Sequence, residues 1–404
     1  MIDLDSPESL QHPTGYFDRA RAAGAVQWSD IHRAWVVIDH AEVASAFRDS
    51  VRLSADRIGP LERAAAPRPA AFGRVVDLLR GWMVFRDPPH HTRLRDPVRN
   101  TFTPRRVDAL SPIVSGVVDD VVASLAPGEI DVRREFAGPL PALVVAAVLG
   151  VDGEDRLRFQ RWSDDLADVV FSTTPSTIPT DEAIEATEEF TRFFEPLIEA
   201  ERRSPSGSLL GHLVAEADSE LDTMELVGAC TLLLFAGHET TTSLLTNVIC
   251  LLMEQPVLLD ELRGRPGIED TAIEEFLRVL GPTRTMFRKA LSDHERGGAL
   301  IHEGDTVALA MVAANHDRTV FSQPEIVDLA RTPNPHLTFG WGLHHCVGAH
   351  LARLEAKLAL RALLARFTSL EAAAPMPPRT GAVMAVPDEP VRIRASGEQE
   401  ASRS

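Results

Sequence analysis

The sequence predicts a mainly α-helical protein that also carries small β-sheets. Four long segments place apolar residues three and four positions apart, which is the spacing of a helix with one buried face. A fifth segment, residues 222–254, is the longest helix candidate, because Asp222 and Glu225 form a capping-box-like start and Pro256 ends it. Only a few short stretches alternate as strands do. The four other helical segments are residues 107–125, 136–149, 155–171 and 181–203.

The remaining segments are expected to be strands and loops. Residues 25–39 predict two short strands about a polar turn, and residues 288–309 predict short strands about glycine turns. Two proline-bearing stretches, residues 58–71 and 172–179, are expected to be loops that either shape ligand entry or only connect helices. We expect one domain over residues 1–404. Its β-rich parts are about 24–60, 288–310 and 380–395, its helical core is about 85–280 and 335–368, and residues 396–404 form a disordered tail.

Composition and charge exclude several classes of protein. With 404 residues, 44% of them hydrophobic and 25% charged, the chain can bury a large core. Its net charge of -18 argues against nucleic-acid binding, which needs a basic surface, and favours a small neutral ligand. Three distant cysteines form no disulfide framework and suit a reducing cytoplasm. The N-terminus lacks a signal-peptide pattern, and the longest apolar stretch, residues 226–237, is far shorter than the ~20 residues of a membrane span.

The long helix candidate contains the unusual stretch LFAGHETTTSLL. Gly237 costs about 1 kcal/mol relative to alanine inside a helix, and three consecutive threonines add crowding. The Thr240 hydroxyl can bond the Ala236 carbonyl, so the helix is expected to open beside Gly237 and leave a dent for a small molecule, with Glu239 as an ionisable neighbour. The alternative is a buried helix with a tolerated glycine. A zinc-protease motif is excluded, because it needs histidine where Thr242 stands.

Two further pairs of side chains have the spacing of helical neighbours. Glu275 and Arg278 are three residues apart and can form an ion pair. His91 and Arg95 are four residues apart on a helix that two prolines open, where cationic groups can hold carboxylates. Each pair is also common on ordinary exposed helices.

The stretch TFGWGLHHCVGAHLAR, residues 338–353, surrounds Cys346 with histidines and glycines. Its possible ligands stand too close together for a tetrahedral zinc site, and no second Cys or His pair occurs elsewhere. A buried structural cysteine would not need Gly340, Gly342 and Gly348. Glycines let the backbone approach a flat object and leave amides to point at the sulfur. Haem iron held by one thiolate is such a case.

These residues resemble the cytochrome P450 monooxygenases. Phe339, Gly342, Cys346 and Gly348 match the family's haem-binding signature F-x-x-G-x-x-x-C-x-G, and HLAR continues it as in soluble bacterial members. Residues 236–240 are similar to the oxygen-activating helix, and residues 275–278 to the helix that braces the haem loop. The resemblance covers essentially the whole chain. It implies the cytochrome P450 fold, a triangular helical domain around a haem with a smaller β-rich region.

The resemblance also implies roles for individual residues. Cys346 is the expected axial ligand of haem b, and Glu239 with Thr240 is the expected acid and alcohol pair that delivers protons to bound dioxygen. Glu275 and Arg278 are expected to brace the loop. Ile326 stands where the family often adds arginine or histidine, so either the bracing differs here or Arg331 is the substitute. The other expected haem contacts are His91, Arg95, Ala236, Gly237, Arg288, Phe339, Gly342, His344 and Gly348.

The implied activity is insertion of one atom of dioxygen into a C–H bond or double bond of a small hydrophobic substrate. The chain has no flavin or iron–sulfur motif, so electrons are expected from NAD(P)H through a reductase and a ferredoxin. A monomer is expected, and the alternatives are direct use of peroxide, oxidative coupling, or a haem-based sensor. The ferredoxin would dock on a basic patch of Arg93, Arg99, Arg353 and Lys357. The expected substrate pocket includes Trp82, Met83, Phe171, Phe235, Met286 and Met384.

Overall fold

The chain folds into two compact units that are each built from several chain segments. The computed structural model describes residues 2–65, 69–151, 155–171, 180–217, 220–381, 386–387 and 389–398. The first unit comprises Met1–Ser54, Val118–Gly138 and Thr240–Ser404, and the second comprises Ala55–Val117 and Pro139–Glu239. Two helices, α8 (Ser111–Ser124) and α13 (Thr223–Glu254), contribute residues to both units.

The described residues of the second unit form helices and connecting loops, with no strand among them. Its longest helix, α11, is held at its N-terminus by the Thr180 hydroxyl, which accepts a hydrogen bond from the Ala183 amide. The elements are α4 (Ile58–Ala65), α5 (Pro69–Arg80), the 3₁₀ turn η1 (Met83–Phe85), α6 (His90–Thr101), α7 (Pro104–Ala109), α9 (Pro139–Leu149), α10 (Arg156–Phe171), α11 (Asp181–Arg203) and α12 (Leu209–Ala217).

The expected loop at residues 58–71 is wrong, because α4 and the start of α5 occupy it. Pro60 and Pro69 stand in the first turns of these two helices, where proline is tolerated since those amides have no partner within the helix. The carboxylate of Asp56 accepts hydrogen bonds from the amides of Ile58 and Gly59, at 2.7 and 3.2 Å, and so starts α4. The second expected loop, residues 172–179, lies outside the described residues.

The predicted helices at residues 181–203 and 222–254 are confirmed as α11 and α13. At the start of α13 the Asp222 carboxylate accepts from the Glu225 amide and the Glu225 carboxylate from the Asp222 amide, which is a reciprocal cap. Residues 107–125 instead divide into α7 and α8, because Pro112 in the first turn of α8 cannot continue the helix before it. In the described part of the chain no single helix is long and apolar enough to cross a membrane. Helices α13 and α14 (Pro256–Gly264), which meet at a bend of 104°, reach that length and composition only when they are taken together.

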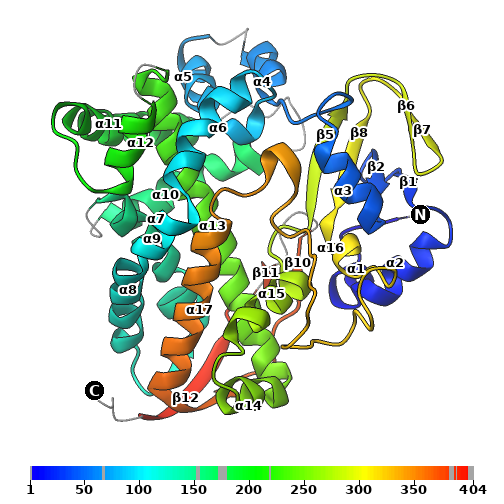
Figure 1. Cartoon of the computed structure of the whole chain (residues 1–404), viewed down its shortest axis with the longest axis vertical. Coiled ribbons are helices and arrows are strands. Elements are labelled where there is room, and N and C mark those ends of the chain that lie inside the picture. Colours follow the sequence, from blue (N-terminus) through cyan, green and yellow to red (C-terminus); the bar gives the residue numbers. More distant parts are fainter. Residues whose placement is uncertain are drawn as a thin grey trace. The chain divides into compact units, whose positions relative to one another are not determined.

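A five-stranded sheet organises the first unit (Figure 1). Its strand order is β1-β2-β8-β5-β3, with β2 and β8 parallel and the other neighbours antiparallel. The predicted strands at residues 25–39 and 288–309 are confirmed. The strands are β1 (Val26–Ser29), β2 (Ala34–Val37), β3 (Leu53–Ser54), β5 (Thr285–Ala290) and β8 (Thr306–Ala310), and β6 (His294–Arg296) with β7 (Ala299–Ile301) forms a separate hairpin.

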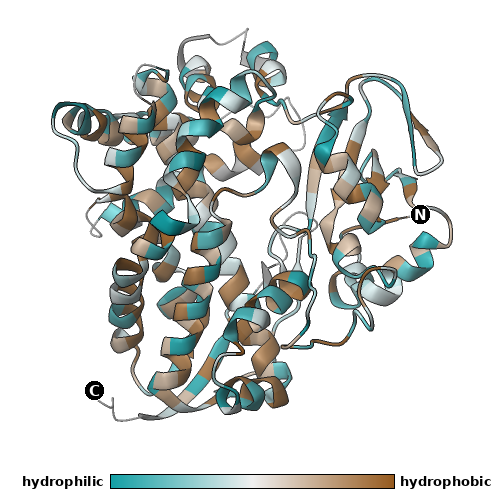
Figure 2. Cartoon of the chain, in the orientation of Figure 1, coloured by the Kyte–Doolittle hydropathy of each residue, from teal (hydrophilic) through white to brown (hydrophobic). Residues whose placement is uncertain are grey.

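Both faces of this sheet are buried, so its central strands are hydrophobic in nearly every position (Figure 2). On one face, Val37 and Leu309 pack with Phe47 of α3 (His40–Arg48). On the other face, Val36 packs with Phe17 of α2 (Pro13–Arg21). The packing on the first face anchors α3 at the edge of the candidate site.

The remaining elements of the first unit frame the cysteine loop and the C-terminal sheet. Strand β12 (Arg392–Glu398) lies between β4 (Gly128–Asp131) and β9 (Phe367–Ala372). Residues 396–398, expected in a disordered tail, therefore belong to a strand, and residues 399–404 lie outside the described residues. The other elements are α1 (Pro7–Gln11), a π-helical turn (Val132–Ala137), α15 (Glu269–Leu280), α16 (Met311–Asn315), the 3₁₀ turn η4 (Gly342–His344), α17 (Ala349–Arg366), β10 (Arg379–Thr380) and β11 (Val386–Pro387).

Candidate active site

Cys346 differs from the other two cysteines in its exposure to solvent. Cys230 and Cys250 are buried, and burial raises the pKa of each thiol to about 12. Cys346 is exposed and stands just before α17, where the partial positive charge of the helix N-terminus favours a thiolate. Only Cys346 of the three is therefore placed to bind a metal through its sulfur.

The backbone holds the Cys346 loop in a fixed conformation. The Cys346 amide donates to the Phe339 carbonyl at 2.9 Å, and the Gly340 amide donates to the Leu337 carbonyl at 2.8 Å. Gly340 and Gly342 have φ angles of 67° and 72°, which side-chain-bearing residues rarely adopt. The predicted need for these two glycines is thus explained by backbone conformation.

Helix α3 supports this loop through Phe47, which the sequence did not single out. A Cβ at Gly342 would lie 2.9 Å from the Phe47 carbonyl oxygen, so only glycine lets the loop come this close to α3. The guanidinium of Arg288, on β5, lies 5.7 Å from the centroid of the Phe47 ring. Phe47 therefore contacts both the cysteine loop and an expected haem-binding arginine.

The start of the loop is fastened to the C-terminal end of α15. The Thr338 hydroxyl donates to the Leu277 carbonyl at 2.7 Å and accepts from the Asn315 amide group at 2.9 Å. A Cβ at Gly281 would lie 2.5 Å from a Thr338 side-chain carbon, so glycine is required where the helix ends. Asn315 also accepts a hydrogen bond from the Leu337 amide at 2.7 Å. Sequence reasoning missed Asn315 and Thr338, because their contacts bring together residues far apart in the chain.

Glu274 ties the loop to both α15 and α17. Its carboxylate contacts Arg353 Nε at 2.5 Å and His336 Nε2 at 3.1 Å, and the Arg353 guanidinium lies 4.5 Å from the centroid of the Phe339 ring. Burial raises the pKa of Glu274, but the hydrogen bonds from Arg353 and His336 outweigh it and hold the pKa at about 2. The carboxylate is thus ionised at neutral pH, and it positions the residues on both sides of Cys346.

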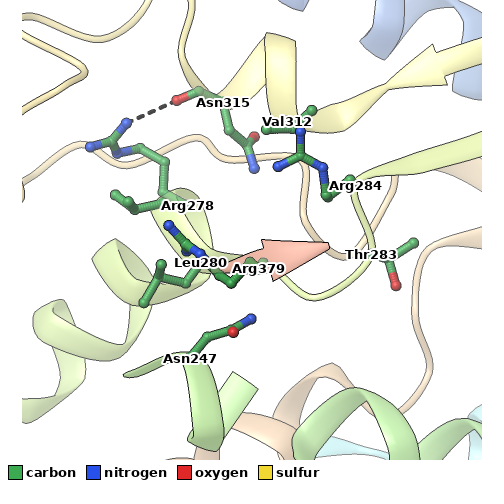
Figure 3. A pocket seen from close by; sticks show the side chains of 10 residues that line it. Asn247, Arg278, Leu280, Thr283, Arg284, Val312, Asn315 and Arg379 are labelled. Atoms are coloured by element: carbon green, nitrogen blue, oxygen red, sulfur yellow. Dashed lines mark hydrogen bonds between the residues drawn. The ribbon is translucent and has the colours of Figure 1, made fainter. Parts of the chain in front are cut away.

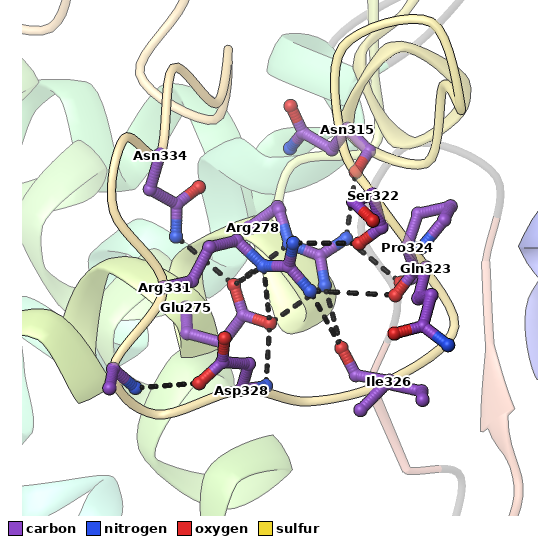
Figure 4. Close-up of polar contacts among 11 residues, drawn as sticks. Glu275, Arg278, Asn315, Ser322, Gln323, Pro324, Ile326, Asp328, Arg331 and Asn334 are labelled. Carbon is purple, nitrogen blue, oxygen red and sulfur yellow. Dashed lines mark hydrogen bonds and ion pairs between the residues drawn. The ribbon is translucent and has the colours of Figure 1, made fainter.

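Glu275 and Arg278 form the predicted ion pair in the interior of the protein. Arg278 donates to both carboxylate oxygens, at 2.9 and 2.8 Å, and both side chains are fully buried. Arg278 also donates to the carbonyls of Asn315 and Pro324, each at 2.9 Å (Figure 4). This pair therefore connects α15 to the chain that leads into the cysteine loop.

Arg331 completes this network as the third charged member. Its Nε lies 3.1 and 3.0 Å from the two Glu275 oxygens, and its guanidinium also donates to the Ser322 carbonyl at 2.9 Å (Figure 4). Burial raises the pKa of Glu275, but the arginines outweigh it and lower the pKa below its usual value. The side chain of Ile326 is half exposed, and its backbone carbonyl accepts from both arginines. Of the two possibilities raised by Ile326, substitution by Arg331 has this structural support.

Helix α13 runs without interruption through Gly237 and Thr240. A Cβ at Gly237 would lie 2.9 Å from a methyl carbon of Val145 on α9, so the glycine has a packing reason. The predicted opening does not break the helix. Glu239 is partly exposed, and its carboxylate lies 3.4 Å from Nδ1 of the buried His238. One turn on, the Thr242 hydroxyl donates to the Ala137 carbonyl at 3.2 Å.

Three of the expected pocket residues lie together in the second unit. The Trp82 ring is 5.1 Å from the Phe235 ring, its Nε1 donates to the Thr231 hydroxyl at 3.1 Å, and Met83 is buried beside it in the chain. Met286 lies on β5 in the other unit, packed against the sheet core. The Phe171 side chain and Met384 fall outside the described residues.

The expected haem contacts divide between the two units. Arg288, Phe339, Gly342, His344, Cys346 and Gly348 belong to the first unit, where Phe47 and Glu274 join several of them as described above. His91 and Arg95 lie on α6 of the second unit, where His91 is 1% exposed, and Ala236 with Gly237 lies on the part of α13 that belongs to that unit.

Comparison with known proteins identifies the family of the chain. The family model described as Cytochrome P450 matches residues 64–264 and 269–393. This chain belongs to the cytochrome P450 family. The nocardicin C N-oxygenase of Nocardia uniformis subsp. tsuyamanensis is 38% identical over 365 residues, which are 88% of this chain and 88% of that protein. The vitamin D(3) 25-hydroxylase of Pseudonocardia autotrophica is 35% identical over 371 residues, covering 90% and 88%.

The solved structures agree with the family and with the predicted fold. The crystal structure of P450BioI in complex with hexadec-9Z-enoic acid ligated acyl carrier protein has a TM-score of 0.83 at 31% identity, covering 96% of this chain and 100% of that one. The relatives are named as oxygenases and hydroxylases, and this P450 is a monooxygenase whose family cofactor is haem.

The residues around Cys346 fit the haem that the cytochrome P450 family implies. The thiol is exposed. A Cβ at position 348 would lie 3.9 Å from the sulfur, in van der Waals contact with it, so glycine at this position leaves that side of the sulfur uncovered. Arg288 supplies a buried cation in the same unit, as carboxylate groups of a cofactor require. An exposed cysteine sulfur, together with a buried cation for the carboxylate groups, suits a haem-thiolate site.

The basic residues expected to receive a redox partner are engaged in ion pairs. Arg353 pairs with Glu274, and Lys357 pairs with Asp270 at 2.6 Å. In the other unit, Arg93 pairs with Glu225, and Arg99 pairs with Asp96 at 3.1 Å. Each positive charge is therefore largely compensated within the P450 itself, which weakens the expected basic patch.

Proposed function

We propose that this P450 inserts one atom of dioxygen into a C–H bond or double bond of a small hydrophobic molecule, using haem b and electrons from a ferredoxin and its NAD(P)H-dependent reductase. The observation that carries the proposal is the exposed Cys346 thiol at the start of α17, in a chain whose other cysteines are buried. When bound, haem supplies the activation of dioxygen.

The protein would hold the cofactor mainly through Cys346 and a set of cationic side chains. Arg288 and His344 in one unit, and His91 and Arg95 in the other, are the residues proposed to bind the two propionate groups. Glu274 and Glu275 support this arrangement indirectly, because they fix the chain on both sides of the cysteine. Their lowered pKa values keep both carboxylates ionised at neutral pH, so these contacts are retained there.

Glu239 and Thr240 are proposed to handle the protons of the reaction. Glu239 is a partly exposed carboxylate in the middle of α13, and the neighbouring His238 imidazole stands 3.4 Å from it. A partly exposed acid can exchange protons with solvent, and an adjacent hydroxyl can pass them inward. The Thr242 hydroxyl donates a hydrogen bond to the Ala137 carbonyl, so the run of threonines also anchors the helix.

The substrate is proposed to be largely apolar. Support comes from the buried aromatic cluster of Trp82, Phe85 and Phe235 beside Met83. Arg57 adds a cationic group to this cluster, since its guanidinium lies 4.7 Å from the centroid of the Phe85 ring and burial lowers its pKa. Named relatives act on chemically different molecules, so the relatives do not select one substrate class.

A ligand screen followed by turnover tests the proposal. Apolar candidates that displace water from the haem are expected to shift its absorption spectrum, and hits are then incubated with ferredoxin, reductase and NAD(P)H under isotopically labelled dioxygen. The product should gain one labelled oxygen atom and the NAD(P)H consumed should match it. Turnover with peroxide but none with the reductase chain would instead favour the peroxide-using alternative.

A further inference from the structure

A small polar cavity lies in the first unit, beside Asn315, which fastens the start of the cysteine loop through Thr338. Its volume is about 10 Å³, and its lining includes Arg284, Arg379, Thr283, Asn315 and Asn247 (Figure 3). These residues come from the chain after α15, from β10, α16 and α13. The volume is close to the minimum that holds one water molecule or one ion of similar size. The cavity can therefore hold a single small ligand.

Arg284 presents a buried and incompletely bonded guanidinium to this cavity. The residue is 5% exposed, and its Nη2 donates to the Ser9 carbonyl at 2.9 Å, while its Nε is buried with no hydrogen-bond partner in the described chain. Burial and then the like charge of Arg379 lower the pKa of Arg284 to about 10. An arginine remains charged at neutral pH even with such a shift, so the positive charge stays in the cavity.

Arg379 brings a second positive charge to the same space. Burial lowers its pKa as well, with a partial offset from Glu254. Within the described residues, no ion pair at 4.0 Å or less joins a carboxylate to Arg284 or Arg379. The contrast is Arg278, which also lines the cavity but is paired with Glu275. The buried Arg284 and the partly exposed Arg379 thus face one cavity, and among the described residues only the longer-range influence of Asp5 and Glu254 offsets their charge.

We propose that this cavity is a binding site for a small monatomic anion such as chloride or bromide, held between Arg284 and Arg379. Burying an unpaired charge is costly, and a bound anion removes much of that cost by pairing with both guanidinium groups. Thr283 and the amide groups of Asn247 and Asn315 add polar lining. Larger anions such as gluconate do not fit the volume. The site is independent of the proposed oxygenation chemistry.

An anion there would stabilise the part of the unit that carries the cysteine loop. It would connect β10 and the chain after α15 in the region that Asn315 already joins to Thr338. The expected effect is a rise of about 3 °C in the melting temperature of the haem-loaded enzyme, when chloride exceeds its dissociation constant about 100-fold. Gluconate at the same ionic strength should not produce this rise.

Two measurements on the haem-loaded enzyme test the site. Crystals soaked in bromide should show an anomalous-scattering peak between the Arg284 and Arg379 guanidinium groups, and melting curves should rise in chloride relative to gluconate. Arg379→Met should abolish the chloride-specific rise, whereas the control Arg192→Met, which removes a surface arginine with 63% side-chain exposure, should keep it.

Either of two results would overturn the proposal. One is a cavity that holds density without an anomalous peak, which would identify a water molecule. The other is an equal melting temperature in chloride and gluconate, which would leave only general screening of charge. The bromide soak uses the unaltered protein, so it decides the question even if Arg379→Met does not fold.

Discussion

Replacing Arg331 by methionine tests whether this residue supplies the third charge of the loop brace. The change removes two contacts of 3.1 and 3.0 Å to Glu275. It also removes the hydrogen bonds from Arg331 to the carbonyls of Ser322, Ile326 and Gln323, at 2.9, 3.1 and 3.4 Å. Glu275 would keep its two contacts with Arg278 and those with the Asp328 amide and the Asn334 side chain, at 2.9 and 3.1 Å. The negative charge of the Glu275 carboxylate would therefore lose one of its two arginine partners and keep the other.

The remaining contacts set the expected magnitude. Removing the partner of a buried charge costs about 3–5 kcal/mol when the charge is left alone. Because Arg278 still pairs with Glu275, we expect the free energy of unfolding to fall by about 2–3 kcal/mol. An unfolding entropy of roughly 2.1 cal/mol/K per residue converts this loss into a melting temperature lower by about 3 °C for a chain of 404 residues.

The assay is urea and thermal unfolding of the haem-loaded enzyme, followed by circular dichroism and by haem absorption. Arg318→Met is the matched control, because Arg318 stands in the same stretch of chain but its side chain is 50% exposed and pairs with Asp18 and Glu325. Haem should also dissociate faster from Arg331→Met than from the control. If the two variants unfold within about 0.5 kcal/mol of each other, Arg331 does not brace the loop.

Three further outcomes are expected. Cys346→Ala should lose the strongly red-shifted absorption of the reduced carbon monoxide complex, and persistence of that band would disprove the ligand assignment. Thr240→Ala should bind substrate normally but divert electrons to peroxide; undiminished coupling of NAD(P)H to product would count against proton delivery. Glu274→Gln should lower the free energy of unfolding by about 3 kcal/mol at pH 7. Because the folded pKa of Glu274 is depressed from 4.5 to about 2, the wild type should lose this advantage as pH falls from about 4.5 towards 2. A difference in the free energy of unfolding between wild type and variant that stays constant from pH 7 to pH 3 would contradict this prediction.

Local sequence patterns predicted a large part of the fold and of the site. The helices at residues 181–203 and 222–254 were predictable because capping side chains and apolar spacing act within a few residues. Glu275 and Arg278 were predictable as a pair for the same reason, since three residues along a helix bring them to one face. The prediction of a loop at residues 58–71 was wrong, because a proline in the first turn of a helix cannot be distinguished by sequence from a proline in a loop.

The sequence by itself determined the family, the single candidate thiolate and the helical character of the chain, because each rests on residue types at fixed short spacing. Only the tertiary structure decided why Gly237 is a glycine, that Arg331 joins Glu275, and that Phe47 and Glu274 support the cysteine loop. It also showed that the buried Arg284 and the partly exposed Arg379 face one small cavity. Such contacts join residues far apart in the chain, and their energies depend on burial and on which charges lie nearby, which no local pattern encodes.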